Sequence, residues 1–173
     1  MRPENVDETL CAGETPADYV LRVARAKADA LWGRDGRDDV LPVLGSDTAV
    51  VLDGQVFGKP RDRDDAIEML ERLSARTHEV YTGVALRSST GSDFRLSVSE
   101  VTFRRLAPAE IAAYWQSGEP ADKAGAYAVQ GLAAVFIERI AGSYSGIMGL
   151  PLFETAELLD QVGIRVPGSL GQH

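Results

Sequence analysis

Apolar residues recur every three or four positions in several stretches of the chain, as they do in amphipathic helices. The first stretch predicts a helix over Pro16–Trp32, because Thr15 is a suitable N-cap and Pro16 suits the first helical position. Its expected buried face consists of Val20, Val23, Ala24 and Leu31. Gly33 and the charged residues 34–39 end this helix.

Three further helices are predicted downstream. The segment Arg63–Leu73 follows Asp62 as N-cap, and Asp65 stands three residues after that cap, as in a capping box. Prolines open the other two helices, at Pro108–Trp115 and Pro151–Val162.

Apolar runs between these helices predict strands. The expected strands are Val40–Leu44, Thr48–Leu52, Gln55–Phe57, His78–Arg87, Phe94–Arg104 and Ala133–Ile140. Asp53-Gly54 favours a tight hairpin, and the polar residues 88–93 favour a turn that pairs the two longest strands antiparallel. Because strands and helices intermingle without a strict βαβ rhythm, the pattern predicts an α/β or α+β fold with a mixed sheet.

The 173 residues suit one compact domain, with a small-residue loop at 142–149 and a loose tail at 166–173. With 45% apolar and 25% charged residues, the composition is that of a soluble globular protein, and no apolar run approaches the ~20 residues that cross a bilayer. Residues 1–8 contain no apolar signal region, and a single cysteine, Cys11, cannot form an internal disulfide. We therefore expect a cytoplasmic protein without a membrane span.

The 18 basic and 26 acidic side chains give a formal net charge of −8, which argues against binding to a long nucleic acid. A local cluster of cations can nevertheless bind a small anion. The basic residues comprise 15 Arg but only three Lys, at Lys27, Lys59 and Lys123. An ammonium and a guanidinium are not interchangeable at a tight phosphate site, so each lysine is a candidate anion ligand.

Lys27 lies on the face of its predicted helix that should be buried, seven residues after Val20 and four before Leu31. Either its stem snorkels from the edge of that face, or its ammonium group meets an anionic partner there. The sequence leaves both interpretations open.

An acidic residue interrupts the strand pattern at Gly45-Ser46-Asp47-Thr48. A carboxylate at this junction can bind a hard cation or orient a water molecule. The local pattern favours the alternative, an Asx-type turn.

The other two lysines lie in segments of unusual composition. Lys59 stands between Gly58 and Pro60, either as a presented phosphate ligand or in an ordinary polar turn. Lys123 and Gln130 lie among very small residues, which leave room for a ligand or suit tight packing.

Several other catalytic motifs are missing from the sequence. His78 lies within a predicted strand and is interpreted as structural, and His173 is the terminal residue. Cys11 has neither a neighbouring His nor a zinc-like spacing, so we expect it to be inert. There is no Walker loop and no Gly-x-Gly-x-x-Gly fingerprint.

Seven short motifs occur in one order along nearly the whole chain. They are Val6-Asp7-Glu8-Thr9, Ala24-Arg25-Ala26-Lys27-Ala28, Leu44-Gly45-Ser46-Asp47-Thr48, Gly58-Lys59-Pro60, Thr77-His78-Glu79-Val80-Tyr81-Thr82-Gly83, Asp122-Lys123-Ala124-Gly125-Ala126-Tyr127, and Gly142-Ser143-Tyr144 with Gly149-Leu150-Pro151-Leu152. With these motifs the chain resembles the Maf family of nucleoside triphosphate pyrophosphatases. The resemblance implies a mixed α/β fold with two lobes around a central cleft, a homodimer, and hydrolysis between the α- and β-phosphates that depends on a divalent metal, Mg or Mn.

The resemblance also implies roles for individual residues. Asp47 matches the catalytic acidic residue that accepts a proton, and with Glu8 it would hold the metal. Thr48 and Gln130 match positions of substrate specificity. The expected ligands of the triphosphate are Lys27, Lys59 and Lys123. Gln130-Gly131 and residues 142–145 resemble the branch that acts on dTTP and UTP; the alternatives are the branch that acts on 7-methyl-GTP and a catalytically impaired nucleotide-binding remnant.

The sequence departs from the family in two places. Ala75 stands where the family usually has Gly, which would strain the turn if a positive φ is needed there. Family members begin with a strand and a Ser-x-Ser-Pro-Arg-Arg loop, and this chain joins their pattern after it, at Met1-Arg2-Pro3. We therefore expect either an N-terminally shortened protein or a misassigned start.

Overall fold

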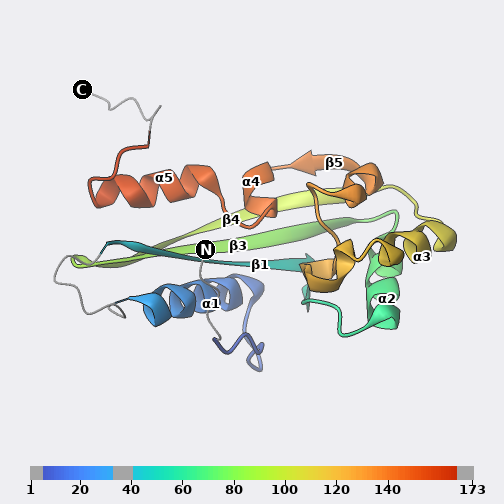
Figure 1. Ribbon diagram of the computed structural model, residues 1–173, viewed down its shortest axis with the longest axis horizontal. Coiled ribbons are helices and arrows are strands. Elements are labelled where there is room, and N and C mark those ends of the chain that lie inside the picture. Colours follow the sequence, from blue (N-terminus) through green and yellow to red (C-terminus); the bar gives the residue numbers. More distant parts are fainter. Residues whose placement is uncertain (1–5, 33–40, 167–173) are drawn as a thin grey trace.

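The fold is built on one twisted sheet of five strands, in a computed structural model that describes residues 6–32 and 41–166 (Figure 1). The strands are β1 (Val43–Leu52), β2 (Gln55–Phe57), β3 (Thr77–Ser88), β4 (Gly91–Phe103) and β5 (Ile137–Ala141). Their order is β2-β1-β3-β4-β5, and every neighbouring pair is antiparallel. The sequence predicts a mixed sheet, but tight turns join β1 to β2 and β3 to β4, which forces those pairs to be antiparallel.

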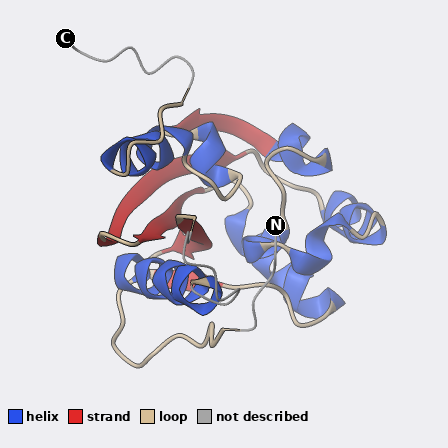
Figure 2. Ribbon diagram, turned by 60° about the vertical axis from the view of Figure 1, so that its left-hand side comes forward, coloured by secondary structure: helices blue, strands red, loops and turns tan. Residues whose placement is uncertain are grey.

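Helices flank this sheet on both faces, as the predicted α/β class requires. They are α1 (Pro16–Leu31), α2 (Arg63–Leu73), α3 (Pro108–Gln116), α4 (Tyr144–Ile147) and α5 (Leu152–Gln161), with 3₁₀ turns η1 (Glu119–Asp122), η2 (Ala124–Ala126) and η3 (Leu132–Phe136). Helix α1 packs on one face of β1 and β3, and α4 and α5 pack on the opposite face (Figure 2). Helices α2 and α3 gather with the 3₁₀ turns at the other end of the sheet (Figure 1).

The hydrophobic core is divided between the two ends of the sheet. The larger part surrounds Phe103, Leu70 and Ile111, where α2, α3 and the 3₁₀ turns meet the sheet. Two small clusters lie at the other end. They are Ala24, Ala28 and Ala85, between α1 and the sheet, and Val84, Leu86 and Leu158, between α5 and the sheet. Between these ends Ser46, Asp47, Thr48, Thr82 and Ser97 form a polar belt across the middle of β1, β3 and β4. The central cleft itself stays a prediction.

The two predicted side-chain N-caps form, but Asp65 does not complete a capping box, because its carboxylate accepts from the amide of Arg61 instead of that of Asp62. Thr15 Oγ1 accepts a hydrogen bond from the amide of Asp18 at 3.2 Å, and Asp62 Oδ1 accepts one from the amide of Asp65 at 2.9 Å. In the hairpin, Asp53 and Gly54 both have positive φ, 52° and 76°, as a type I′ turn requires. The predicted end of the first helix at residues 33–39, the strand start at Val40 and the tail beyond residue 166 lie outside the described residues.

The strand character predicted at 43–44 and Thr48–Leu52 is confirmed, but the predicted break between the two strands is wrong, because β1 runs without interruption through Ser46 and Asp47. Its ladder with β3 extends from the Val43–Arg87 pair to the Val51–Glu79 pair. Backbone hydrogen bonds hold the polar residues in the strand whatever their side chains, so the Asx-turn interpretation of Asp47 is also wrong.

The predicted strand Ala133–Ile140 is wrong over its first half, which forms η3. The carboxylate of Glu119 accepts hydrogen bonds from the amides of Leu132 at 2.9 Å and Ala133 at 3.3 Å. These contacts satisfy the free donors at the start of a helical turn. The segment 142–149 also contains a short helix, α4, whose N-cap Ser143 accepts from the amide of Gly146 at 3.0 Å.

Candidate active site

Asp47 and Lys27 form the centre of the candidate site. Asp47 lies in the middle of β1 on the face that α1 covers, and its Oδ1 is 2.6 Å from Nζ of Lys27. The Asp47 side chain is 10% exposed and that of Lys27 is 25% exposed. Lys27 therefore does lie on the sheet side of its helix, and it ends on a carboxylate instead of reaching solvent.

Two glycines allow this contact by letting α1 approach the sheet closely. A Cβ at Gly45 would lie 2.1 Å from the carbonyl oxygen of Ala24, and one at Gly83 would lie 2.7 Å from that of Val20. Both distances are far below van der Waals contact, so only glycine fits at these two strand positions.

A second carboxylate joins the pair from the segment before α1. Glu8 Oε1 is 2.8 Å from the Lys27 ammonium nitrogen, and Glu8 Oε2 is 3.8 Å from Nζ of Lys59. Four of the residues singled out in the sequence thus form one cluster, in which two carboxylates alternate with two ammonium groups. Lys59 is its most exposed member, with 63% of its side chain exposed.

The surroundings push the pKa values of the two carboxyl groups apart. Burial raises the pKa of Asp47, although Lys27 opposes this. The hydrogen bond from Lys27 lowers the pKa of Glu8. Burial alone would lower the pKa of Lys27, but its hydrogen bonds to both carboxylates more than compensate and raise it. A pair of carboxyl groups with divergent pKa values is typical of a site that needs one proton acceptor and one permanent anion.

The donor set fits a hard divalent cation that is shared with a substrate. Asp47 and Glu8 offer carboxylate oxygens, the ligands that Mg²⁺ and Mn²⁺ prefer. Within residues 6–32 and 41–166 no group of three or more His, Cys, Asp or Glu side chains could hold a metal alone. Mg²⁺ is commonly held by one or two carboxylates together with substrate phosphates, which is what two carboxylates flanked by lysines can supply.

Lys123 lies next to this cluster without contacting it. Its Nζ is 2.6 Å from Oδ1 of Asp122, and its segment is tied to the Lys59 segment by a 3.0 Å hydrogen bond from the amide of Gly125 to the carbonyl of Gly58. Both Lys123 and, more weakly, Lys59 lower the pKa of Asp122. Gln130 is exposed in the turn that follows.

Thr48 lies on the opposite face of the sheet from Asp47, because successive side chains of a strand alternate. Its Oγ1 is 2.9 Å from Oγ1 of Thr82, which donates to the carbonyl of Gly146 at 2.8 Å. Since the Thr82 hydrogen is used in that bond, Thr48 is the donor to Thr82. Ser46 Oγ, also on this face, is 2.7 Å from the carbonyl of Gly149. The polar belt thus holds the segment 142–149 on the side away from Asp47.

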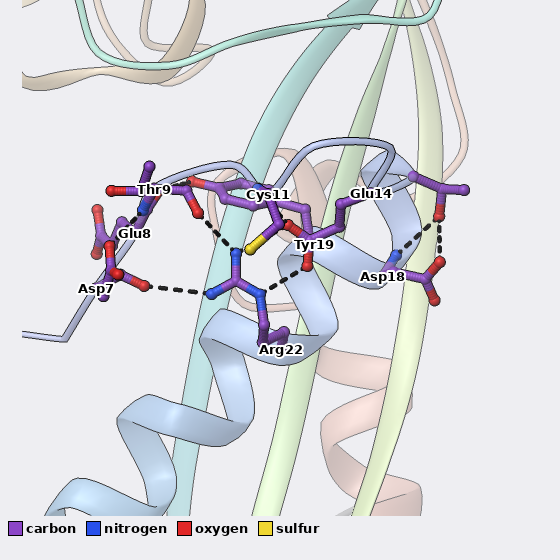
Figure 3. A network of polar contacts seen from close by, with 9 residues as sticks. Asp7, Glu8, Thr9, Cys11, Glu14, Asp18, Tyr19 and Arg22 are labelled. Carbon is purple, nitrogen blue, oxygen red and sulfur yellow. Dashed lines mark hydrogen bonds and ion pairs between the residues drawn. The ribbon is translucent and has the colours of Figure 1, made fainter.

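Sequence reasoning missed two residues that shape the site, Arg22 and Tyr19 on α1 (Figure 3). Both hydrogen-bond to backbone carbonyls of the segment that carries Glu8. Every residue offers a carbonyl, so these contacts leave no signature in the sequence of the segment they hold.

Two further residues singled out in the sequence are His78 and Cys11. His78 is 2% exposed, and its Nε2 is 2.8 Å from the hydroxyl oxygen of Tyr127, so it is a core residue. Cys11 is an exposed free cysteine. None of the described helices is long and apolar enough to cross a membrane.

Known proteins resemble the chain over nearly its full length. The model of the family described as Maf-like protein matches residues 1–162. A dTTP/UTP pyrophosphatase of Nitrosomonas europaea is 54% identical over 167 residues, which cover 95% of this chain and 81% of that protein. The dTTP/UTP pyrophosphatase of Alkalilimnicola ehrlichii is 56% identical over 162 residues, or 92% of this chain and 80% of that protein. Family match and sequence identity agree with the order of the motifs, and the chain belongs to the Maf family.

Proposed function

We propose that this protein is a nucleoside triphosphate pyrophosphatase that hydrolyses dTTP and UTP to the nucleoside monophosphate and pyrophosphate. The names of relatives more than half identical support the substrates. The observation that carries the chemistry is the Lys27 ammonium group between the carboxylates of Asp47 and Glu8, at 2.6 and 2.8 Å. Such a cluster can bind a polyphosphate and hold a carboxylate ready to accept a proton.

In the proposed reaction a water molecule attacks the α-phosphorus and the bond from that phosphorus to the α,β-bridging oxygen breaks. Asp47 accepts the proton of the attacking water, and its raised pKa makes it a stronger base than an exposed carboxylate. The pyrophosphate leaves with the bridging oxygen. Little covalent catalysis is needed, so positioning and charge neutralisation carry most of the rate enhancement.

The other residues of the cluster bind charge. Lys27 and Lys59 neutralise phosphate oxygens, and Lys123 does so from the adjoining segment. Asp47 and Glu8 hold a divalent metal, Mg or Mn, which when bound supplies positive charge for the triphosphate. Glu8 suits this role because its pKa is lowered and it stays ionised.

Base recognition is assigned to exposed Gln130, whose amide both donates and accepts hydrogen bonds, as a pyrimidine edge requires. For Thr48 the proposed role in specificity is indirect: it lies on the opposite face from Asp47 and would act through Thr82, which bonds to the segment 142–149.

We also propose that the protein is cytoplasmic, that its chain forms a single domain, and that two chains form a homodimer. The dimer follows from the family resemblance, and the exposed free thiol of Cys11 suits a reducing compartment. Size-exclusion chromatography with light scattering tests the dimer, and a mass of one chain would contradict it.

The deciding experiment measures pyrophosphate release from dTTP, UTP, dCTP, ATP, GTP and 7-methyl-GTP with Mg²⁺ or Mn²⁺. We expect dTTP and UTP to be the fastest substrates. Asp47→Asn should lower their turnover by about 10²–10⁴-fold, the usual contribution of a general base. Asp53→Asn is the matched control, since Asp53 lies in the hairpin and pairs only with Arg76 at 2.7 Å among the described residues.

Three results would contradict the proposal in different ways. Preferred turnover of 7-methyl-GTP would assign the chain to that branch. Binding of dTTP without pyrophosphate release would make it a nucleotide-binding remnant. Parental turnover by Asp47→Asn or Lys59→Ala would show that the reaction does not take place at the proposed site.

A further inference from the structure

Like Lys59, Glu8 belongs to neither a helix nor a strand. It lies in the segment that precedes α1. A carboxylate on such a segment has no regular hydrogen-bond ladder to set its position, so other contacts must do so.

Those contacts come from α1 and reach three consecutive carbonyl groups (Figure 3). Arg22 donates to the carbonyl of Asp7 at 3.3 Å and to that of Thr9 at 2.9 Å. The Tyr19 hydroxyl donates to the carbonyl of Glu8 itself at 3.0 Å. The backbone on both sides of Glu8 is therefore fixed to the helix.

Arg22 is itself held by a second anchor. Its Nε and Nη2 donate to the two carboxylate oxygens of Glu14 at 2.6 and 2.9 Å, and Glu14 also accepts from the amide of Cys11 at 3.1 Å. The hydrogen bond from Arg22 lowers the pKa of Glu14 to about 2, so this ion pair persists across the physiological pH range. A bidentate pair of this kind fixes the plane of the guanidinium group.

Helix α1 thus carries both Arg22, which holds the backbone around Glu8, and Lys27, which contacts the Glu8 carboxylate. Arg22 and Lys27 lie on α1, and Lys27 is 2.8 Å from Glu8 Oε1. The distance between carboxylate and ammonium is then set within one rigid unit, and Asp47 is the strand residue against which that unit docks.

We propose that Arg22, fixed by Glu14, is a positioning residue that places the Glu8 carboxylate to bind the divalent metal with the substrate triphosphate. This inference rests on the proposed function of the site. Tyr19 acts with Arg22 in the same role. The competing interpretation is that Arg22 only ties the preceding segment to the fold.

The test uses the full chain and four variants. Arg22→Gln removes the guanidinium, Arg22→Lys retains the charge and one donor group, and Tyr19→Phe removes one hydroxyl. Arg25→Gln is the matched control, because Arg25 lies on the same helix but stacks on the ring of Phe94, at 3.7 Å from its centroid.

Position and metal affinity are measured directly. Hydrogen–deuterium exchange reports on the backbone of residues 6–11. Electron paramagnetic resonance of free Mn²⁺ gives its affinity in the presence of a dTTP analogue with a methylene group between the α- and β-phosphorus. We expect faster exchange in Arg22→Gln and a Mn²⁺ dissociation constant raised about 10-fold, the lower end for loss of a group that orients a metal ligand. Arg22→Lys should recover part of this loss, and Tyr19→Phe should show a smaller one.

Kinetics separates positioning from a merely structural role. The Mn²⁺ concentration for half-maximal pyrophosphate release should rise in Arg22→Gln, while the KM for dTTP stays near its parental value. A structural role would lower the melting temperature and the active fraction and leave the metal dependence unchanged.

The inference is overturned if Arg22→Gln binds Mn²⁺ as the parent does, if Arg25→Gln shows the same loss, or if the parent binds no Mn²⁺ with the analogue. A parent that binds Mn²⁺ with the analogue but releases no pyrophosphate from dTTP contradicts the proposed function alone.

Discussion

The ammonium nitrogen of Lys27 lies 2.6 Å from Oδ1 of Asp47, although one residue belongs to a helix and the other to the strand beneath it. This contact joins α1 to β1 at the polar belt of the sheet. It is partly buried, so each charge depends on the other more than an exposed pair would.

The coupling between these charges should be measurable. Lys27→Met leaves the Asp47 carboxylate partly buried without its closest cation, and we expect it to lower the free energy of unfolding by about 1–3 kcal/mol. The double variant with Asp47→Asn should lose less than the sum of the single variants, because the unpaired charge is gone. Urea denaturation of the four proteins measures this cycle. Strict additivity would show that the pair contributes nothing to stability.

The close approach of α1 to the sheet should be needed for both stability and activity. Gly83→Ala forces the helix outward, with an expected cost of about 1–3 kcal/mol for overpacking. Pyrophosphate release should fall as well, since Lys27 moves with the helix. Gly54→Asn is the control: its φ of 76° suits Asn, and a Cβ there meets nothing within 4 Å. Parental stability of Gly83→Ala, measured by urea denaturation, would contradict the close packing.

The connection from Thr48 through Thr82 to Gly146 predicts a shared effect on specificity. If Thr48 acts through this chain, Thr48→Val and Thr82→Val should change the ratio of dTTP to UTP turnover in the same direction. Thr82→Val should also cost about 1–3 kcal/mol, because the Gly146 carbonyl loses its donor. Thr82→Ser retains the hydroxyl and should behave like the parent. A changed ratio in Thr48→Val alone would instead indicate direct contact with the base.

His78 should make stability depend on pH. Burial lowers its pKa from 6.5 to about 4, so the unfolded chain binds the proton more tightly and stability falls as the pH falls through 6.5 toward 4. Between about pH 7.5 and about pH 5 this contribution is about 2 kcal/mol. Urea denaturation at both pH values should show a smaller decrease in His78→Gln than in the parent. Equal decreases would mean that His78 is protonated in the folded protein.

Ala75 should be a site at which glycine stabilises the protein. Its φ is 58°, so the turn does need the positive φ that would make alanine strained there, and its side chain is exposed. Ala75→Gly should raise stability by about 0.5–1 kcal/mol, after allowance for the larger entropy of glycine in the unfolded chain. Ala113→Gly, at an exposed position in α3, should lower it by about 1 kcal/mol. Thermal unfolding compares the two variants, and a loss of stability in Ala75→Gly would contradict the strain.

The sequence by itself determined the helices with clear caps, the Asp53-Gly54 hairpin and the family, because these depend on neighbouring residues or on the order of motifs. It also singled out Asp47, Glu8, Lys27 and Lys59. It was wrong about the break in β1 and about the strand at Ala133, where bonding to distant partners outweighs local apolar pattern.

Only the tertiary structure decided which of these residues meet. The approach of α1 at Gly45 and Gly83 brings Lys27 to Asp47, and the alternation of strand side chains sends Thr48 to the opposite face. The role of Arg22 was invisible in the sequence, because it contacts backbone carbonyls that every residue possesses. Local physical chemistry can be read along the chain, whereas the site depends on contacts between segments that the chain keeps far apart.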